Sequence, residues 1–427
     1  MKMKKSLAIV LSAGMALTMF AGCGGSPKAT SAAPAASASK AGTEEQITLS
    51  VFDAHAYGLD EYAAMVKEFE AAHPNIKVEV QHAANDNDML MKARINSGDI
   101  PDVFNAQAGS VAQDYYEYAY DWSNDSEVLS LFDDAAIDTG KNAEGKVMSL
   151  PWTYENMGMI YNKDAFEKAG ITKLPATMTE LEDACKKLKE AGITAFALAA
   201  KEQWVLNQIS THYMMDKKLD AAGVEAAVMD GSLKVPDMPN IKNFYKLLDL
   251  AVEYGPEKPL EVDWETSENM LANGEAAIIH MGDWCQATLD GFNPDANLGF
   301  LPCPVSENPE DATLLSSVSW TYIVNKDSAH LDAAKEYLEF ILTSETGIKW
   351  ARETVGIVSA AKSDILVKAK LANDAAAYIK EGKTNGWIHT LMPGDMATNI
   401  GPVYQSYMLG QTTIEDGMQQ AQDFWKA

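Results

Sequence analysis

The chain has 427 residues, of which 47% are hydrophobic and 22% charged, and this is more chain than one ordinary domain takes. Its 61 acidic residues outnumber its 34 basic residues, which gives a formal net charge of −27. Such a surface repels nucleic acid and anionic lipid head groups, so both are excluded as partners. The composition therefore predicts a large acidic protein with two lobes.

The N-terminal residues have the pattern of an export signal. Residues Met1–Lys5 carry three lysines, and an apolar run extends over Leu7–Phe20. A run of roughly 14 residues is too short to span a membrane, which takes about 20, but it suits a secretory signal. Phe20–Cys23 also resembles the bacterial lipobox, whose cysteine becomes the lipidated first residue; the alternative is an ordinary signal peptide with a chance cysteine. We expect residues 1–22 to be the signal peptide and Cys23 to carry the lipid.

The segment after Cys23 predicts a tether. From Gly24 to Thr43 the chain is almost entirely Gly, Ser, Ala, Pro, Lys and Thr. Without large apolar side chains, this segment cannot bury enough surface to offset the entropy of ordering. We therefore expect residues 23–45 to be a disordered tether. It would hold the protein on the outer face of the cytoplasmic membrane, and no later stretch approaches 18 consecutive apolar residues.

Strands and helices alternate after the tether. Apolar and β-branched runs predict strands, and apolar residues three and four apart predict helices. The first elements expected are the strand 47–52, the helix 59–73, the strand 77–80, the helix 88–96 and the strand 103–104. This alternation is typical of α/β units on a mainly parallel sheet.

The middle and the end of the chain are richer in helix. A capping-type start at Thr179 and a closing Gly192 bound one helix. The remaining elements expected are helices over 240–254, 332–342 and 413–425, and strands over 195–198, 276–280, 298–302 and 320–324. The fold class that follows is α/β.

The cysteines and histidines give little sign of a metal or a cofactor. Cys185, Cys285 and Cys303 remain once Cys23 is assigned to lipid, and only Cys285 with Cys303 is considered as a disulfide; buried free thiols are favoured. The 7 histidines lack metal-ligand spacing. Residues 85–88 resemble a calcium loop, but they lack its glycine and its terminal glutamate, so we interpret them as a solvated turn. No metal and no cofactor are expected.

Four segments together resemble the solute-binding proteins of bacterial ABC importers, in their carbohydrate-binding branch. One segment reads Ser-Gly-Asp-Ile-Pro-Asp, and another, Asn-Gly-Glu-Ala-Ala, runs into Gly-Asp-Trp. The resemblance is spread from about Ile47 to Trp425. The four segments are 97–102, 150–170, 273–284 and 324–338.

The resemblance implies a two-lobed periplasmic-binding-protein-like fold with three hinge crossovers, expected near Trp152, Leu298 and Val324. It also implies a monomer that captures a carbohydrate and delivers it to the transmembrane subunits of an ABC permease. The N-lobe is expected to comprise residues 46–152 and 299–324, and the C-lobe residues 153–298 and 325–427.

A site for a neutral sugar needs flat aromatic rings for the ring faces and carboxyl or amide groups for the hydroxyls. Trp284 matches the tryptophan of the family's Gly-x-Trp segment, directly after Asp283, and Glu155 lies within the first crossover. For Trp284 the alternative is a core residue, and for Glu155 a hinge ion pair. The other residues expected at strand ends and crossovers are Asp53, His55, Asn105, Gln107, Trp152, Glu202, Trp204 and Trp320.

Several of these expectations have structural alternatives. His55 suits a structural hydrogen bond as well as the cleft, and Trp320 suits sheet packing equally well. Asn105 stands where maltose-type members have an aromatic residue, which argues against a long maltodextrin ligand. Weaker candidates for the cleft are Trp387, Asn399 and Tyr404, and we expect Trp122, Trp350 and Trp425 in the core.

The sequence favours a binding protein over an enzyme. It contains none of the common nucleophile-elbow, zinc-protease, phosphate-loop or dinucleotide motifs. Two alternatives stay open. The same fold can bind a peptide, a polyamine or another solute, and the many carboxylates can supply a glycosidase pair by chance.

Overall fold

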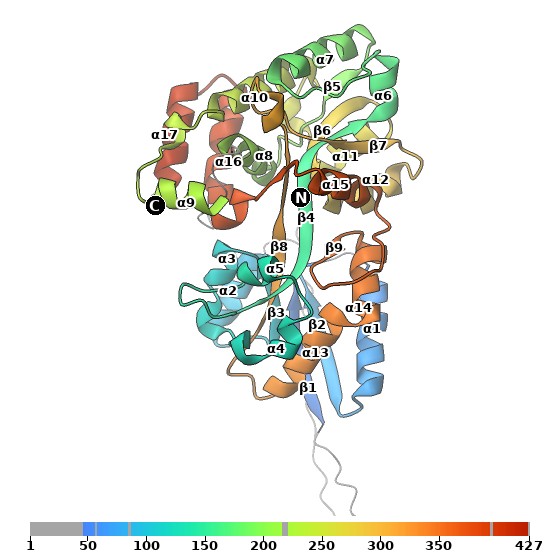
Figure 1. Ribbon diagram of the computed structural model, residues 1–427, viewed down its shortest axis with the longest axis vertical. Coiled ribbons are helices and arrows are strands. Elements are labelled where there is room, and N and C mark those ends of the chain that lie inside the picture. The colour runs from blue at the N-terminus through green and yellow to red at the C-terminus, as the bar shows by residue number, and fades with distance from the viewer. Residues whose placement is uncertain (1–45, 56–57, 84–86, 216–220, 393–395, 426–427) are drawn as a thin grey trace, which may run out of the picture. The chain divides into compact units, whose positions relative to one another are not determined.

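The computed structural model describes residues 46–55, 58–83, 87–215, 221–392 and 396–425. Residues 45–427 form one compact unit, in which a single mixed sheet continues through two lobes (Figure 1). The strand order is β2-β1-β3-β8-β4-β6-β5, with β10 on β8 and with β7 and β9 on β4. The expected signal peptide, the lipidated Cys23 and the tether 23–45 lie outside the described residues.

The N-lobe has a parallel core of three strands, β1 (Ile47–Asp53), β2 (Ile76–His82) and β3 (Val103–Gln107). Helix α1 (Leu59–Ala72) packs on it through Tyr62, Met65, Val66 and Phe69, whose spacing places them on one face. The other elements are α2 (Asn87–Ser97), α3 (Ser110–Gln113), α4 (Ser126–Leu129), α5 (Asp134–Asp138), α13 (Leu331–Thr343), α14 (Glu345–Lys349) and β9 (Val358–Ser359).

The C-lobe is built around β6 (Ala276–Gly282), which pairs in parallel with β5 (Thr194–Phe196), and β7 (Leu298–Leu301). Every residue of β6 is buried, as expected for a strand that is covered on both faces. The helices are α6 (Lys163–Lys168), α7 (Met178–Glu190), α8 (Gln203–Met214), α9 (Ala221–Met229), α10 (Ile241–Tyr254), α11 (Trp264–Ala272), α12 (Gln286–Phe292), α15 (Lys370–Lys380), α16 (Met396–Met408) and α17 (Ile414–Phe424), and β10 (Thr384–Asn385) joins the sheet edge.

Two long antiparallel strands carry the chain between the lobes. Strand β4 (Leu150–Asn162) and strand β8 (Leu314–Val324) pair from Leu150 opposite Tyr322 to Met157 opposite Leu315, with register shifts beside Thr153. The N-lobe half of each strand packs into one core cluster and the C-lobe half into another. Figure 1 shows both strands running from one lobe into the other. The expected first crossover near Trp152 therefore lies on β4.

The core clusters divide the chain differently from the expected lobe boundaries. Residues 298–315, apart from the surface loop, pack in the C-lobe cluster, so the chain does not cross near Leu298. Helix α13 and the residues up to Ala361 pack in the N-lobe cluster, and Leu371 is the next core residue of the C-lobe. The third passage thus lies between Ala361 and Leu371 rather than at Val324. The amphipathic pattern of α13 marks a helix, but it carries no information about which lobe the helix covers.

Three further expectations concern single features. Cys185, Cys285 and Cys303 are free and buried, as favoured. Within the described residues, no helix is both long and apolar enough to cross a membrane. Of the calcium-like turn, Asn85 and Asp86 lie outside the described residues, and Asn87 begins α2.

Candidate functional site

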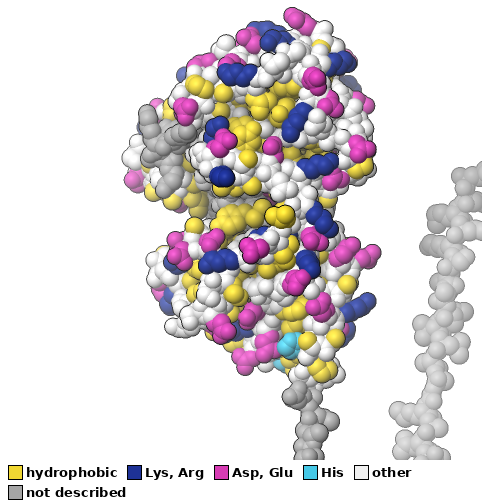
Figure 2. All heavy atoms as spheres, turned by 45° about the vertical axis from the view of Figure 1, so that its right-hand side comes forward, with side chains coloured by type: hydrophobic (Ala, Val, Ile, Leu, Met, Phe, Trp, Pro, Cys, Tyr) yellow, Lys and Arg dark blue, Asp and Glu magenta, His cyan; other side chains and the backbone are white. Residues whose placement is uncertain are grey.

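A cavity of about 240 Å³ lies between the two lobes, beside the long strands β4 and β8. Figure 2 shows the waist of this part of the molecule, where hydrophobic side chains reach the surface. The cavity is lined by both lobes and by the strands between them. Its lining residues are Ala54, His55, Asn87, Gln107, Glu155, Trp204, Gln208, Trp284, Ser319, Trp320, Trp387, His389 and Thr390.

The structure brings six of the expected site residues together around this cavity. They are His55, Gln107, Glu155, Trp204, Trp284 and Trp320, and the weaker candidate Trp387 joins them. Asp53, Asn105, Trp152 and Asp283 are buried and do not line it, and Glu202 is half-buried just before α8. Of the remaining candidates, Asn399 is half-buried and Tyr404 buried outside the lining, while Trp122, Trp350 and Trp425 are core residues as expected.

The C-lobe side of the cavity is an aromatic wall. Trp284 and Trp387 are nearly parallel, with ring centroids 5.8 Å apart and an interplanar angle of 6°. Trp204 comes from the first turn of α8. Gly282 makes room for Trp284, because a Cβ atom added there would lie 1.8 Å from Cζ3 of that ring. The Gly-x-Trp segment thus has a local cause: the indole folds back over a residue without a side chain.

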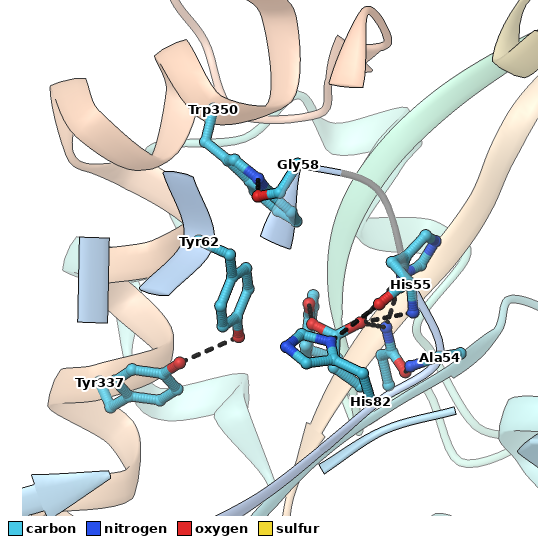
Figure 3. Close-up of polar contacts among 10 residues, drawn as sticks. Ala54, His55, Gly58, Tyr62, His82, Tyr337 and Trp350 are labelled. Atoms are coloured by element: carbon cyan, nitrogen blue, oxygen red, sulfur yellow. Dashed lines mark hydrogen bonds and ion pairs between the residues drawn. The ribbon is translucent and has the colours of Figure 1, made fainter. Parts of the chain in front are cut away.

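The N-lobe side is a polar wall centred on His55 (Figure 3). Asp53 holds this residue: its Oδ1 accepts from the His55 backbone N–H at 2.8 Å and lies 3.1 Å from His55 Nδ1. Asn105 donates to the same Oδ1 at 3.0 Å, and the Tyr322 hydroxyl donates to Oδ2 at 2.6 Å. Burial raises the pKa of Asp53, but the hydrogen bonds and charge of His55 with the Tyr322 bond outweigh it, so the pKa falls below its usual value. Asp53 is therefore an ionised anchor beneath the wall.

Aromatic rings fix the other faces of His55. Trp152 and Trp320 meet its ring edge-on, with centroid distances of 4.2 and 4.6 Å. Behind it, Trp152 stacks on Trp350 at 5.3 Å and 13°. Trp152 was expected to face the cleft, but it points into the N-lobe core and supports His55 from behind.

Two acids lie where β4 passes between the lobes. Burial and the nearby Asp283 raise the pKa of Glu155 to about 8, against a smaller effect of the Ser319 hydrogen bond. Burial raises the pKa of Asp283 to about 7, although it accepts hydrogen bonds from the Asn156 backbone N–H at 3.1 Å and side-chain Nδ2 at 2.8 Å. The expected alternative of a hinge ion pair does not apply to Glu155, since no ion pair joins it to a described cationic side chain.

The cavity carries no fixed positive charge among its described lining residues. None of them is Lys or Arg. Burial lowers the pKa of His389 to about 4, so this ring is neutral at pH 7. Four tryptophans, neutral amides and hydroxyls, and one carboxyl that is largely protonated at neutral pH form a surface suited to an uncharged, hydroxyl-rich ligand.

Some lining residues escaped the sequence reasoning. Gln208 lies four residues after Trp204 on α8 and therefore on the same helix face, a spacing that the sequence shows. Ser319 precedes Trp320 on β8. His389 and Thr390 belong to a short 3₁₀ turn, Ile388–Leu391, and nothing local in the sequence indicates that this turn reaches the cleft.

The lobes also touch each other beside the cavity. The Ser110 hydroxyl, on α3 of the N-lobe, donates to the backbone oxygen of Met392 in the C-lobe at 2.6 Å. Gly109 has φ of 83°, and a Cβ atom there would lie 1.7 Å from the Thr390 oxygen. This close approach requires glycine on both counts.

Comparison with known proteins adds to this geometry. The family described as bacterial extracellular solute-binding protein matches residues 56–348. An uncharacterized ABC transporter extracellular-binding protein of Pyrococcus horikoshii is 28% identical over 306 residues, which is 66% of this chain and 65% of that protein. The melibiose/raffinose/stachyose-binding protein MelE of Bacillus subtilis is 23% identical over 81% of each chain.

Solved structures share the fold. The SBP RafE in complex with raffinose superposes with a TM-score of 0.75 at 19% identity, covering 89% of this chain and 98% of that one. This likeness agrees with the two-lobed α/β architecture expected from the sequence.

Proposed function

The chain belongs to the family of bacterial extracellular solute-binding proteins, and on this premise we propose that it captures a mono- or oligosaccharide in the cavity between its lobes and delivers it to an ABC importer. The observation that carries the proposal is the lining: four tryptophans with amide and hydroxyl groups, and no Lys or Arg among the described lining residues. Indole faces stack on the apolar faces of pyranose rings, while amides and carboxyls bind hydroxyls.

The named substrates of relatives support a sugar. MelE is named for melibiose, raffinose and stachyose, and the RafE structure holds raffinose. These names belong to those proteins, so the identity and the length of the sugar bound by this chain follow only from experiment.

The proposal gives each wall its own task. Trp284 and Trp204 stack on the sugar rings from the C-lobe side. His55 and Gln107 bind hydroxyls from the N-lobe side, with Asp53 holding His55 in place. A ligand that contacts both lobes at once favours the arrangement in which the lobes are close, and the permease would recognise that arrangement.

The cellular setting of the proposal comes from the N-terminal pattern. Residues 1–22 are removed as a signal, Cys23 is lipidated, and residues 23–45 tether the protein to the outer face of the cytoplasmic membrane. The protein acts as a monomer beside the permease, binds no nucleic acid and catalyses no reaction. The acidic net charge of −27 suits such a freely diffusing domain.

A thermal-shift screen tests the proposal. Purified protein is heated with mono- and oligosaccharides, and with peptides and polyamines alongside. A ligand that binds only the folded state stabilises it by about 2.7 kcal/mol at a hundredfold excess over its Kd. We expect a rise in Tm with one class of sugar and no new product by chromatography. A rise only with a polyamine or a peptide overturns the substrate but keeps the fold, and release of a cleaved sugar overturns the binding role.

A further inference from the structure

A second cluster of reactive side chains lies in the C-lobe core, away from the lining of the cleft. His212 comes from α8, His280 from β6, and Cys303 follows β7. One ligand atom from each lies within 4.8 Å of the others, and the three side chains are 1%, 2% and 0% exposed. The three residues are distant in the sequence, and none of the sequence motifs joined them.

The geometry of the two imidazoles is close to that of a metal site. His212 Nδ1 and His280 Nε2 are 3.1 Å apart, and the rings meet at 78°. Two nitrogens bound tetrahedrally at about 2.0–2.1 Å from a zinc ion lie about 3.3 Å from each other. A widening of a few tenths of an ångström therefore admits an ion between the two nitrogens, and the Cys303 thiol needs a larger approach of about 1 Å.

Without an ion, the hydrogen bonds of this pair do not balance. Burial lowers the pKa of His212 to about 3, against a smaller opposing effect of the Thr313 backbone, and lowers that of His280 well below its usual value, so both rings are neutral. A neutral ring has one N–H. If one ring donates its inner N–H to the other, its own outer nitrogen is left as a bare acceptor in the core.

The outer nitrogens show this deficit. Neither His212 Nε2 nor His280 Nδ1 has a hydrogen-bond partner among the described residues. Buried polar atoms without partners are rare, and an ion that is absent from the coordinates is one of the usual causes. With a cation between the inner nitrogens, both outer nitrogens would carry N–H groups, and the Thr313 backbone is placed to accept from one of them.

We propose that His212, His280 and Cys303 bind a divalent transition-metal ion, with Zn²⁺ as the preferred ion and Co²⁺ as a spectroscopic substitute. Two imidazoles and a thiolate suit Zn²⁺ and exclude Ca²⁺ and Mg²⁺, which take oxygen ligands. On binding, the thiol proton of Cys303 leaves to solvent and the sulfur forms the bond to the metal, so the site gains one net positive charge. The Tyr213 hydroxyl, 3.7 Å from Cys303 Sγ, is the nearby polar group for the remaining position.

Such an ion would brace the aromatic wall from below. His212 lies one turn after the lining residue Gln208 on α8, and His280 lies four residues before Trp284. The metal would therefore fix the helix that carries Trp204 to the strand that leads to Trp284. This consequence rests on the proposed function, but the metal site does not.

Metal uptake during refolding tests the site directly. Tag-free full-length protein is unfolded with a chelator and refolded with Co²⁺, with Zn²⁺ or with EDTA, and excess metal is removed. We expect one bound ion per chain, a thiolate-to-Co²⁺ absorption band that Zn²⁺ abolishes, and a higher Tm than for the EDTA sample. Less than about a tenth of an ion per chain, at the tenfold loss expected of a disrupted site, overturns the proposal.

Matched variants separate this site from surface binding. Cys303→Ser should lose the absorption band and lower metal content at least about tenfold, whereas Cys285→Ser, another buried thiol of the same lobe, should keep both. Should Cys303→Ser fail to refold, His280→Gln gives the same reading. Equal uptake by wild type, Cys303→Ser and His280→Gln overturns the site. A sugar shift that persists in an unmetallated protein leaves the proposed function intact.

Discussion

The two walls of the cleft are built in opposite ways. On the N-lobe side, His55 is held by Asp53, Asn105 and two tryptophan edges, and both oxygens of the Asp53 carboxylate accept hydrogen bonds. On the C-lobe side the wall is aromatic, and Trp387 Nε1 and His389 Nδ1 are buried without a hydrogen-bond partner among the described residues. The polar wall is complete in itself, whereas the aromatic wall has donors and surface that only a ligand can satisfy.

This difference predicts where binding energy is lost on mutation. Large aromatic surfaces at the centre of an interface carry most of its energy, so changes in the C-lobe wall should cost the most affinity. Changes in the N-lobe wall act through the orientation of His55 and should cost less affinity but more stability, because its network is buried.

Trp284→Ala should have the largest effect. It removes one face of the Trp284–Trp387 pair and the surface on which we propose a sugar ring stacks. We expect affinity for the sugar found in the screen to fall about 100-fold, or about 2.7 kcal/mol, by titration calorimetry. Trp264→Ala is the control, because Trp264 packs partly buried on the C-lobe core outside the cavity lining. Equal losses in the two variants would assign the effect to folding rather than to the wall.

Gly282→Ala attacks the same wall without removing the indole. The added Cβ would lie 1.8 Å from the Trp284 ring, so the ring must leave its position. We expect affinity to fall about tenfold, since a displaced anchor loses most of its contact. Gly291→Ala is the matched control, because a Cβ there meets nothing within 4 Å. Unchanged affinity in Gly282→Ala would show that the observed position of Trp284 is not the one used for binding.

The sequence revealed the aromatic wall better than the polar one. Trp284 and Trp204 follow buried strands, and Glu155 lies on the first crossover, so local pattern and resemblance placed them near the cavity. The sequence cannot show the depth of a residue below a wall. Asp53 and Asn105 end their strands as expected, but both lie beneath the polar wall and bind His55.

The remaining misses have a common cause. The lobe of α13, the turn that carries His389 and the approach of His212 to His280 all depend on how distant segments pack. Helical periodicity marks a face that will be buried but does not identify what buries it. The first and third crossovers differ in the same way, because β4 continues through both lobes while the third passage is irregular chain.

Asp53→Asn should affect the polar wall mainly through stability. The isosteric amide loses the charge that accepts from Tyr322 and His55, so we expect a loss of about 1.5–3 kcal/mol of unfolding free energy and a smaller fall in affinity, about fivefold. The Asp53 pKa is below its usual 3.8 in the folded protein, so its stabilisation is present above that pH and is lost as the pH falls through the folded pKa. The Tm difference between wild type and variant should therefore shrink in acid. A constant difference down to pH 2.5 would contradict an ionised Asp53.

The acid between the two walls predicts a pH dependence of binding. Glu155 has a pKa of about 8 in the free protein because of burial and Asp283. A neutral sugar buries it further, raises that pKa and takes up a proton, so affinity should fall as the pH rises above about 8, by up to about tenfold per pH unit. Calorimetry from pH 6 to 9 in buffers of different ionisation enthalpy measures both the affinity and the proton. Glu155→Gln should show a flat profile, and affinity that rises with pH would indicate a cationic ligand instead.

Ser110→Ala should have the smallest effect, because it leaves both walls intact and removes only one contact between the lobes. The Ser110 hydroxyl donates to the Met392 backbone oxygen at 2.6 Å, and a net hydrogen bond is worth about 0.5–1.5 kcal/mol. If binding requires the lobes to be close, losing this bond lowers the fraction of protein in that arrangement, and affinity should fall about threefold with little change in Tm. Ser130→Ala is the control, since its hydroxyl bonds only to the Glu127 oxygen within the same short segment of the N-lobe. Equal affinities for both variants would mean that the contact between the lobes contributes nothing to capture, so the walls alone would set the affinity.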